Sequence, residues 1–332
     1  MLRSHGLWLL LAASVVTVGA ALALGPHGVL SAPWTTNETE REIVRHVRLP
    51  RVVLGFVAGA ALAIAGMAFQ ALFRNALATP YTLGVSAGAS FGAALYVKAG
   101  LTASIAGIPG YAIAALCGAL LTIALVYGMG GAAVGFSPAT LLLGGVAVSF
   151  LFTSLILTIQ YLGDVTTSFR IGRWLLGGLE IVGFAPLLQL LPFVGIGLAV
   201  LLAIPRELDL LVVGEESAAA RGVSVDVTRR LVFLASSLMV GGVVAVCGPI
   251  GFVGVIVPHV GRLLLGPRHR TLGPFCLLAG GAFLVICDTV GRIVVAPVEI
   301  PVGIITALIG VPFFLALLVQ GHLRLRRAHG GL

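Results

Sequence analysis

Apolar runs of about 20 residues recur along the whole chain, separated by short stretches that contain proline, glycine or charged residues. Each run is long enough to cross the ~30 Å hydrocarbon core of a bilayer as a helix. The pattern predicts an all-α polytopic membrane protein with about ten transmembrane helices. The eighth run is short and begins at Gly248-Pro249, so we expect a tilted or partly re-entrant helix there. The predicted spans are residues 7–24, 51–73, 80–98, 108–129, 139–162, 185–203, 230–247, 251–266, 272–291 and 301–320.

The first apolar run leaves two interpretations open. Arg3 precedes residues 7–24, and Ala21-Leu22-Ala23 has the small residues of a signal cleavage site, so a secretory signal is one interpretation. The run is longer than the ~7–15 apolar residues that are usual in a signal core. We therefore favour a retained first helix. The topology of the later spans is the same in either case.

Composition supports one transmembrane domain over residues 1–332. Hydrophobic residues make up 59% of the sequence and charged residues 10%, whereas about 25% charged residues is typical of soluble domains. The 45 glycines fit this class, because small residues allow helices to pack closely in lipid. The net charge of +8 comes from basic residues scattered at the ends of spans, so we expect no nucleic-acid partner.

The sequence contains no pattern typical of an enzyme or a metal site. It has no G-x-x-x-x-G-K-[ST] loop to bind ATP phosphates, no HExxH and no GxSxG. The four cysteines lie within apolar runs without a CxxC pair, so we interpret them as packing residues. His259 has no partners at metal-ligand spacing and is interpreted as a helix-packing residue near the inner face. We therefore expect no catalytic residues and no metal or cofactor bound by this chain.

The distribution of lysine and arginine between alternate loops orients the chain in the membrane. With the N-terminus inside, twelve basic residues fall on the cytoplasmic side and eight on the outer side, which favours cytoplasmic placement of both termini. Half of the outer residues lie in one short loop before the second span, against the usual bias. This excess indicates that the loop has a function. Its basic residues are Arg41, Arg45, Arg48 and Arg51.

A weak inverted internal repeat accompanies this topology. Gly59–Gly66 matches Gly241–Gly248 in its glycine and alanine spacing, and the second and seventh spans run in opposite directions. Inverted repeats are typical of transporters. Convergent glycine packing explains eight residues about as well, so both explanations stay open.

Two polar groups at the ends of spans have alternative interpretations. Residues 205–230 form the largest inner loop, which is either a solvated connection or a segment that docks a cytoplasmic partner through a short helix at 217–220. Asp288 and Arg292 lie one helical turn apart at the outer end of the ninth span. They are a structural ion pair, an arginine that reaches a partner while Asp288 orients it, or, least favoured, a proton relay.

Arg170, Arg173 and Trp174 belong to an amphipathic outer segment after the fifth span. An interfacial anchor explains them, and the lining of an outward-facing cavity is the second interpretation. The sequence shows no buried charge cluster. We therefore expect a transport pathway with few specific polar contacts.

Several sequence blocks together resemble the permease subunits of type II ABC importers, the family that takes up iron-siderophores, haem and cobalamin. The resemblance covers nearly the whole chain, from about Arg48 to Val319, and it is specific because the blocks occur jointly. Asn75-Ala76-Leu77-Ala78 departs from the family pattern by lacking a proline, and Arg221 stands where leucine is common. The blocks are residues 48–89 (from RLPR to TLGVSAGA), 174–179 (WLLGGL), 217–223 (SAAARGV), 248–270 (GPIGFVGVIVPHVGRLLLGPRHR) and 287–314 (CDTVGRIVVAPVEIPVGIITALIGVPFF).

The resemblance implies a function and a set of partners. It implies a homodimer with the pathway on its two-fold axis, two cytoplasmic ATPase subunits that bind ATP and Mg²⁺, and an extracytoplasmic substrate-binding protein. A ferric siderophore is the commonest cargo of the family, with haem and cobalamin as alternatives. The complex is expected in the cytoplasmic (inner) membrane.

The resemblance also assigns roles to residues of this sequence. Arg48, Arg51 and Arg292 match the positions that receive glutamates of the binding protein. Residues 205–230 become the cytoplasmic coupling loop to the ATPase. A proton-coupled secondary carrier that uses Asp288 is the alternative from a different class of transporter. The segment that matches the ATPase contact consists of Ser217, Ala218, Ala219, Ala220, Arg221, Gly222 and Val223.

Overall fold

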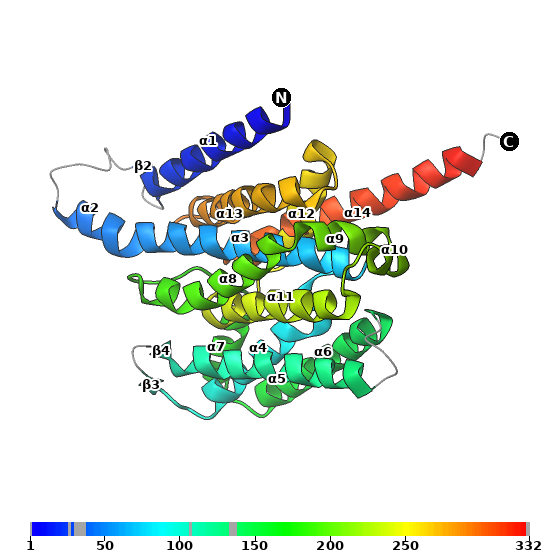
Figure 1. The fold of residues 1–332 in the computed structure, drawn as a ribbon. Helices are drawn as coiled ribbons and strands as arrows, with labels where there is room; N and C mark the ends of the chain where they lie inside the picture. The colour runs from blue at the N-terminus through cyan, green and yellow to red at the C-terminus, as the bar shows by residue number, and fades with distance from the viewer. Residues whose placement is uncertain (1, 26–27, 30–37, 106–107, 133–137, 330–332) are drawn as a thin grey trace.

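The computed structural model describes residues 2–25, 28–29, 38–105, 108–132 and 138–329, which are almost entirely helical (Figure 1). Two antiparallel pairs of very short strands join helices, β1 (Leu24–Gly25) with β2 (Gly28–Val29) and β3 (Ser104–Ile105) with β4 (Ile108–Pro109). The helices are α1 (Leu2–Ala23), α2 (Glu38–Ile43), the π-helix η1 (Val44–Arg48), α3 (Leu49–Leu72), the 3₁₀-helix η2 (Pro80–Leu83), α4 (Val85–Lys98), α5 (Gly110–Ala132), α6 (Pro138–Tyr161), α7 (Val165–Leu175), α8 (Ala185–Ala203), α9 (Pro205–Val213), α10 (Glu215–Ala220), α11 (Val225–Cys247), α12 (Val253–Leu265), α13 (His269–Ile293) and α14 (Val302–His329).

Each predicted span corresponds to a helix, which confirms the predicted fold class. The ten helices are α1, α3, α4, α5, α6, α8, α11, α12, α13 and α14. Within the described residues, six helical stretches are long and apolar enough to cross a bilayer, and the longest is Glu40–Leu72. Helices α1, α12 and α14 contribute shorter apolar stretches. Helix α8 begins and ends at the residues predicted for the sixth span.

Helix α3 is the centre of the bundle. Most of its residues are buried, and it packs against α8, α11, α12 and α13. Two of these contacts depend on glycine, because a Cβ atom at Gly59 would lie 2.2 Å from the carbonyl oxygen of Gly280 in α13. A Cβ atom at Gly66 would lie 2.1 Å from the carbonyl oxygen of Gly254 in α12. Small residues thus allow the backbone contacts that hold helices together in lipid.

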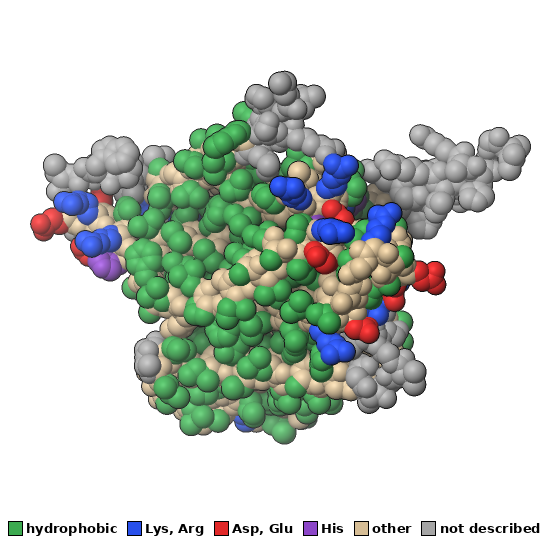
Figure 2. All heavy atoms as spheres, in the orientation of Figure 1, with side chains coloured by type: hydrophobic (Ala, Val, Ile, Leu, Met, Phe, Trp, Pro, Cys, Tyr) green, Lys and Arg blue, Asp and Glu red, His purple; other side chains and the backbone are tan. Residues whose placement is uncertain are grey.

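The surface of the bundle is apolar between two polar ends. Figure 2 shows a broad hydrophobic face over the middle of the molecule, with charged side chains gathered mainly at α2 on one side and around α9 and α10 on the other. Large apolar side chains such as Leu143, Phe150 and Leu188 are exposed. This distribution is expected of helices that face lipid, with polar groups at the two membrane surfaces.

Helix α3 runs antiparallel to α11 and α13. Arg74, just after the end of α3, pairs with Glu215, which shortly precedes α11. Arg51, near the start of α3, pairs with Asp288 near the end of α13. The two repeated glycine segments therefore belong to antiparallel helices that contact each other, in agreement with the opposite directions expected from the sequence.

The structure corrects three local expectations. The basic stretch before the second span is helical and not a loop, because α2 and η1 continue into α3. The third span is divided at Gly84, whose φ of 78° ends η2 before α4 begins. The eighth span is shorter than predicted, because residues 248–252 are non-helical with positive φ at Gly248 and Phe252.

Helix α1 packs against α13 and α3. Ala21 lies in an apolar cluster with Val52 of α3 and Val285 of α13. Ser14 donates a hydrogen bond to the carbonyl oxygen of Leu278 in α13 at 3.4 Å. The retention of this first helix in the mature protein stays a prediction.

The packing interpretation of the cysteines is correct for three of the four. Cys117 is exposed on α5, whereas the other three thiols are buried. Within the described residues, the thiol of Cys117 is thus not part of the packed core. The ring of His259 packs edge-on against Phe313 with ring centroids 5.8 Å apart, in agreement with its interpretation as a packing residue.

Candidate functional site

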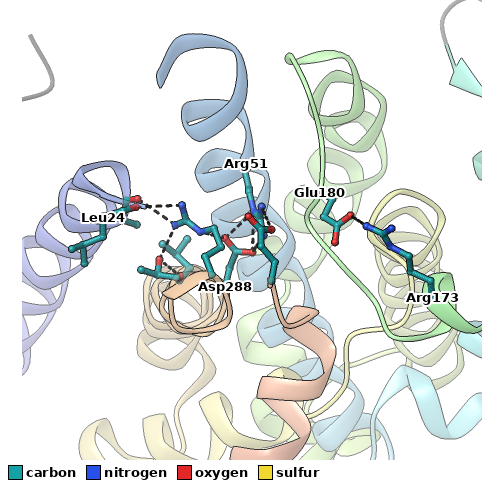
Figure 3. Close-up of polar contacts among 10 residues, drawn as sticks. Leu24, Arg51, Arg173, Glu180 and Asp288 are labelled. Carbon is teal, nitrogen blue, oxygen red and sulfur yellow. Dashed lines mark hydrogen bonds and ion pairs between the residues drawn. The ribbon is translucent and has the colours of Figure 1, made fainter. Parts of the chain in front are cut away.

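A cluster of charged side chains lies at the ends of α3 and α13 that the sequence predicts to be on the outer side, where Figure 3 shows Arg51 and Asp288 pointing toward each other. Arg51 Nη2 donates to Asp288 Oδ1 at 2.8 Å, and Arg51 Nη1 donates to Glu299 Oε2 at 2.7 Å. Arg292 Nε lies 3.1 Å from Asp288 Oδ2. Arg48 lies beside them at the end of η1. We call these five residues the outer arginine cluster.

Two arginines of this cluster cap the C-terminal end of α1. The last carbonyl groups of a helix have no partners within the helix, and cations are favoured at that end. Arg48 Nη1 donates to two carbonyl oxygens at 3.1 and 3.3 Å, and Arg292 donates to two others at 3.3 and 3.4 Å. The four acceptors belong to Ala21, Leu22, Ala23 and Leu24.

The outer arginine cluster corrects one prediction and refines another. The prediction that the chain has no buried charge cluster is wrong, since Arg51, Asp288 and Arg292 are only 9%, 4% and 3% exposed. Charged groups persist at such depth when they are paired with each other or with backbone carbonyls. Of the alternatives for Asp288 and Arg292, a structural ion pair describes the observed contacts. The docking role of Arg48, Arg51 and Arg292 stays a prediction.

The amphipathic outer segment is helix α7. Arg173 is exposed and pairs with Glu180 (Figure 3). It lines a hollow of about 460 Å³ together with Glu299. Trp174 is half-buried and packs on the main apolar core, and Arg170 is exposed. Arg173 therefore has the position expected of a cavity-lining residue, whereas Trp174 and Arg170 do not line this hollow.

The inner loop folds into two short helices, α9 and α10, that meet at Gly214. The short helix predicted at 217–220 is confirmed and begins two residues earlier. Ala218 is fully buried, whereas the next four residues are exposed. The segment Ser217–Val223 thus presents small side chains to solvent at the end of the molecule opposite α2 (Figure 1).

Helix α9 is attached to α13 through Asp209. Asp209 Oδ1 accepts a hydrogen bond from the backbone N–H of His269 at 2.9 Å and lies 2.7 Å from its ring Nδ1. His269 is the first residue of α13, so Asp209 caps that helix from another part of the chain. Partial burial raises the pKa of the Asp209 carboxyl, but the hydrogen bonds from His269 and the charges of His269 and Arg268 together lower it by more, so this pKa lies below its ordinary value.

Asp209→Ala is expected to lower the free energy of unfolding by about 1 kcal/mol, because α13 loses its cap. The lowered pKa means that this contribution is fully present above about pH 3.9, the ordinary pKa of aspartate, and is lost as the pH falls through the folded-state pKa. Thermal unfolding in detergent, compared at pH 7 and at decreasing pH, measures the effect. A stability difference that stays constant down to the lowest pH would contradict it.

A larger hollow beside α14 is apolar. It has a volume of about 580 Å³ and lies between the end of α7, the non-helical residues after α11 and the first half of α14. Its lining includes Leu176, Pro249, Gly303, Ala307 and Val311.

Sequence reasoning assigned no role to three acidic residues that organise these sites. Glu299, Asp209 and Glu215 each pair with a basic residue that is 248, 60 or 141 positions away in the chain. One signal was available, because the chain has only 12 acidic residues. In so apolar a sequence, each acid close to the end of a span is a candidate partner for an arginine.

Comparison with known proteins shows what the chain is similar to. The profile of the FecCD transport family matches residues 6–320. The chain is 42% identical to the uncharacterized ABC transporter permease protein YvrB of Bacillus subtilis, over 87% of this chain and 81% of the relative. It is 42% identical to the cobalamin import system permease protein BtuC of Halobacterium salinarum, over 93% and 86% of the two chains. A solved structure described as an inward-facing conformation of a metal-chelate type ABC transporter matches with a TM-score of 0.86 and 32% identity, over 96% of this chain and 99% of the other.

Proposed function

The chain belongs to the FecCD transport family of ABC transporter permeases, and from that premise we propose that it is the membrane-spanning subunit of an ATP-driven importer for an iron chelate. The proposed substrate is a ferric siderophore that a soluble binding protein delivers. This chain forms the pathway, and a partner ATPase binds ATP and Mg²⁺. Haem and cobalamin are the alternative cargoes, because relatives named as hemin and cobalamin permeases are 35% and 42% identical to this chain.

The observation that carries this proposal is one antiparallel helix pair with polar contacts at both ends. At the outer side, α3 and α13 are joined by the ion pair between Arg51 and Asp288. At the inner side, the same two helices contact α9, and the end of α3 also reaches α10. An importer permease needs a site for a delivery partner at one end and a site for an ATPase at the other, connected by rigid elements.

The outer arginine cluster is the proposed docking surface for the binding protein. Its three arginines and two carboxylates leave one positive charge in excess, which attracts acidic groups on a partner. Arg51 and Arg292 are tied to Asp288, so reversing their charge would disrupt the fold as well as the surface. Arg48 donates to backbone carbonyls and is the better position for a test.

Arg48→Gln is expected to weaken binding of the loaded binding protein by roughly fivefold, or about 1 kcal/mol, because the excess positive charge is lost. Binding to the permease–ATPase complex in nanodiscs measures this effect. Arg41→Gln, which removes an exposed arginine of α2, is the matched control and should have a smaller effect. The difference between Arg48→Gln and wild type should shrink at high salt. Equal affinities at low salt would refute the docking role of this position.

The segment Ser217–Val223 is the proposed contact for the ATPase. Its exposed small residues permit close approach of a partner, and the exposed Arg221 adds a positive charge. Two copies of the permease with two ATPase subunits form the proposed complex, and the apolar hollow beside α14 is a candidate wall of the pathway between the copies. The complex is placed in the cytoplasmic (inner) membrane with both termini in the cytoplasm.

A proton-coupled carrier is disfavoured by the contacts of Asp288. A proton relay requires a carboxylate that exchanges protons with water. Asp288 is 4% exposed and lies between the guanidinium groups of Arg51 and Arg292. Its single negative charge is thus shared by two buried cations, which is the arrangement of a structural ion pair.

Titration of the cognate binding protein with ferric siderophores, haem and cobalamin tests the proposed cargo, because delivery by that protein selects what reaches the pathway. Tight binding of a ferric siderophore supports the proposal. Selective binding of haem or cobalamin would show that this ligand, and not a siderophore, is the cargo. The proposed class of importer would be unchanged.

A further inference from the structure

Glu215 joins three parts of the inner surface. It is the first residue of α10. Its Oε1 accepts a hydrogen bond from Nη2 of Arg74 at 3.1 Å and also contacts Nη2 of Arg229. Arg74 directly follows the last turn of α3, and Arg229 lies in the second turn of α11. One carboxylate therefore connects α10 to both helices.

Both arginines have restricted positions, Arg229 because it is buried and Arg74 because of its backbone conformation. Arg229 is 7% exposed, and its other acidic neighbour, Asp226, is 3.8 Å away with a side chain that is 68% exposed. A buried guanidinium needs a close acidic partner, and Glu215 is the closer of the two. The backbone of Arg74 has φ 48°, a conformation that only a few per cent of non-glycine residues adopt. Its position in the turn after α3 is thus fixed by the surrounding structure.

Helix α10 is not a continuation of α9. Gly214 has φ 146°, which breaks the helix between them. Ala218 is fully buried and anchors one side of α10. An apolar contact of a methyl group is not directional, so it does not fix the orientation of the helix. The charged contact through Glu215 is directional and reaches two transmembrane helices at once.

We propose that Glu215 is a positioning residue that couples α10 to α3 and α11, so that a displacement of α10 by the ATPase moves both helices together. The inference rests on the proposed function of Ser217–Val223 as the ATPase contact. Helix α3 would pass the displacement on to α13, because the backbones of the two helices are in close contact at Gly59 and Gly280. Without the carboxylate, the ATPase still contacts α10, but movement of α10 is transmitted less completely.

The test compares Glu215→Gln with the matched control Glu216→Gln in the permease–ATPase complex in proteoliposomes, with the binding protein present. The readout is the number of substrate molecules imported per ATP hydrolysed, which a smaller amount of folded complex does not change. We expect Glu215→Gln to lower this ratio by about fivefold or more. Glu216→Gln should match wild type, and Glu215→Asp should recover part of the ratio because the charge is kept.

One result would overturn the inference. An unchanged ratio in Glu215→Gln, even with uptake and ATP hydrolysis both reduced in equal proportion, would show that the carboxylate does not transmit movement and has only a structural role. If the wild-type complex shows ATP-driven uptake while Glu215→Gln keeps its ratio, the inference fails and the proposed function stands. If the wild-type complex shows no ATP-driven uptake, both fail.

Discussion

Asp288→Ala is expected to lower the free energy of unfolding by about 3–5 kcal/mol, because it removes the partner of two buried cations. Asp288 contacts both Arg51 and Arg292, and Glu299 alone would remain to balance them. Without Asp288, at least one guanidinium would be left without an acidic partner at the edge of the hydrocarbon region. Thermal and denaturant unfolding of the purified permease in detergent measures the loss.

The matched control for Asp288→Ala is Glu42→Ala. Glu42 also forms an i,i+4 pair, with His46, but both side chains are more than half exposed. Exposed pairs contribute about 0–1 kcal/mol, so the control should unfold close to wild type. Similar unfolding of both variants would show that the outer arginine cluster does not stabilise the fold.

Gly59→Ala is expected to destabilise the bundle by about 3 kcal/mol, at the upper end of the usual effect of overpacking. The new methyl carbon would lie 2.2 Å from the carbonyl oxygen of Gly280 and 2.7 Å from Leu284 Cβ. A backbone oxygen in a helix cannot move aside as the tip of a side chain can, so α3 and α13 would have to separate. The effect is measured as a smaller amount of correctly folded permease by size-exclusion chromatography and as a lower temperature of thermal unfolding.

Gly195→Ala on α8 is the matched control for this substitution. A Cβ atom at Gly195 meets no heavy atom within 4 Å. Alanine is favoured over glycine within a helix by roughly 0.5–1 kcal/mol, so this variant should be as stable as wild type or slightly more stable. If Gly59→Ala were as stable as Gly195→Ala, that result would contradict the close contact between α3 and α13.

The transmembrane helices could be predicted from sequence because each apolar run must form its backbone hydrogen bonds within itself in lipid. Helix α8 shows this most clearly, since both of its ends match the prediction. The helix before α3 was not predicted, because Pro50 stands directly before the apolar run and proline is favoured in the first turn of a helix. Pro50 has no N–H group, so the carbonyl oxygen of His46, four residues earlier, lacks its usual helical hydrogen-bond donor. The backbone N–H of Gly183 donates to that carbonyl at 2.7 Å, and this long-range bond allows η1 to continue into α3.

The charged sites could be predicted only in part. The local pair of Asp288 and Arg292 follows from i,i+4 spacing, but Arg51 reaches Asp288 from 237 positions away. Counting charges places a residue at one membrane surface and says nothing about which helix lies beside it. Burial of the arginines therefore required the packing of α1, α3 and α13. The alanines of α10 indicated a short helix, whereas its attachment through Glu215 depended on two distant arginines.

The most direct test of the central claim is uptake of a labelled ferric siderophore by proteoliposomes that contain this permease, its ATPase and the loaded binding protein. We expect uptake that requires ATP and the binding protein and that persists when the proton gradient is abolished. Uptake by the permease alone, driven by a proton gradient without ATP, would contradict the assignment of this chain as the membrane subunit of an ATP-driven importer.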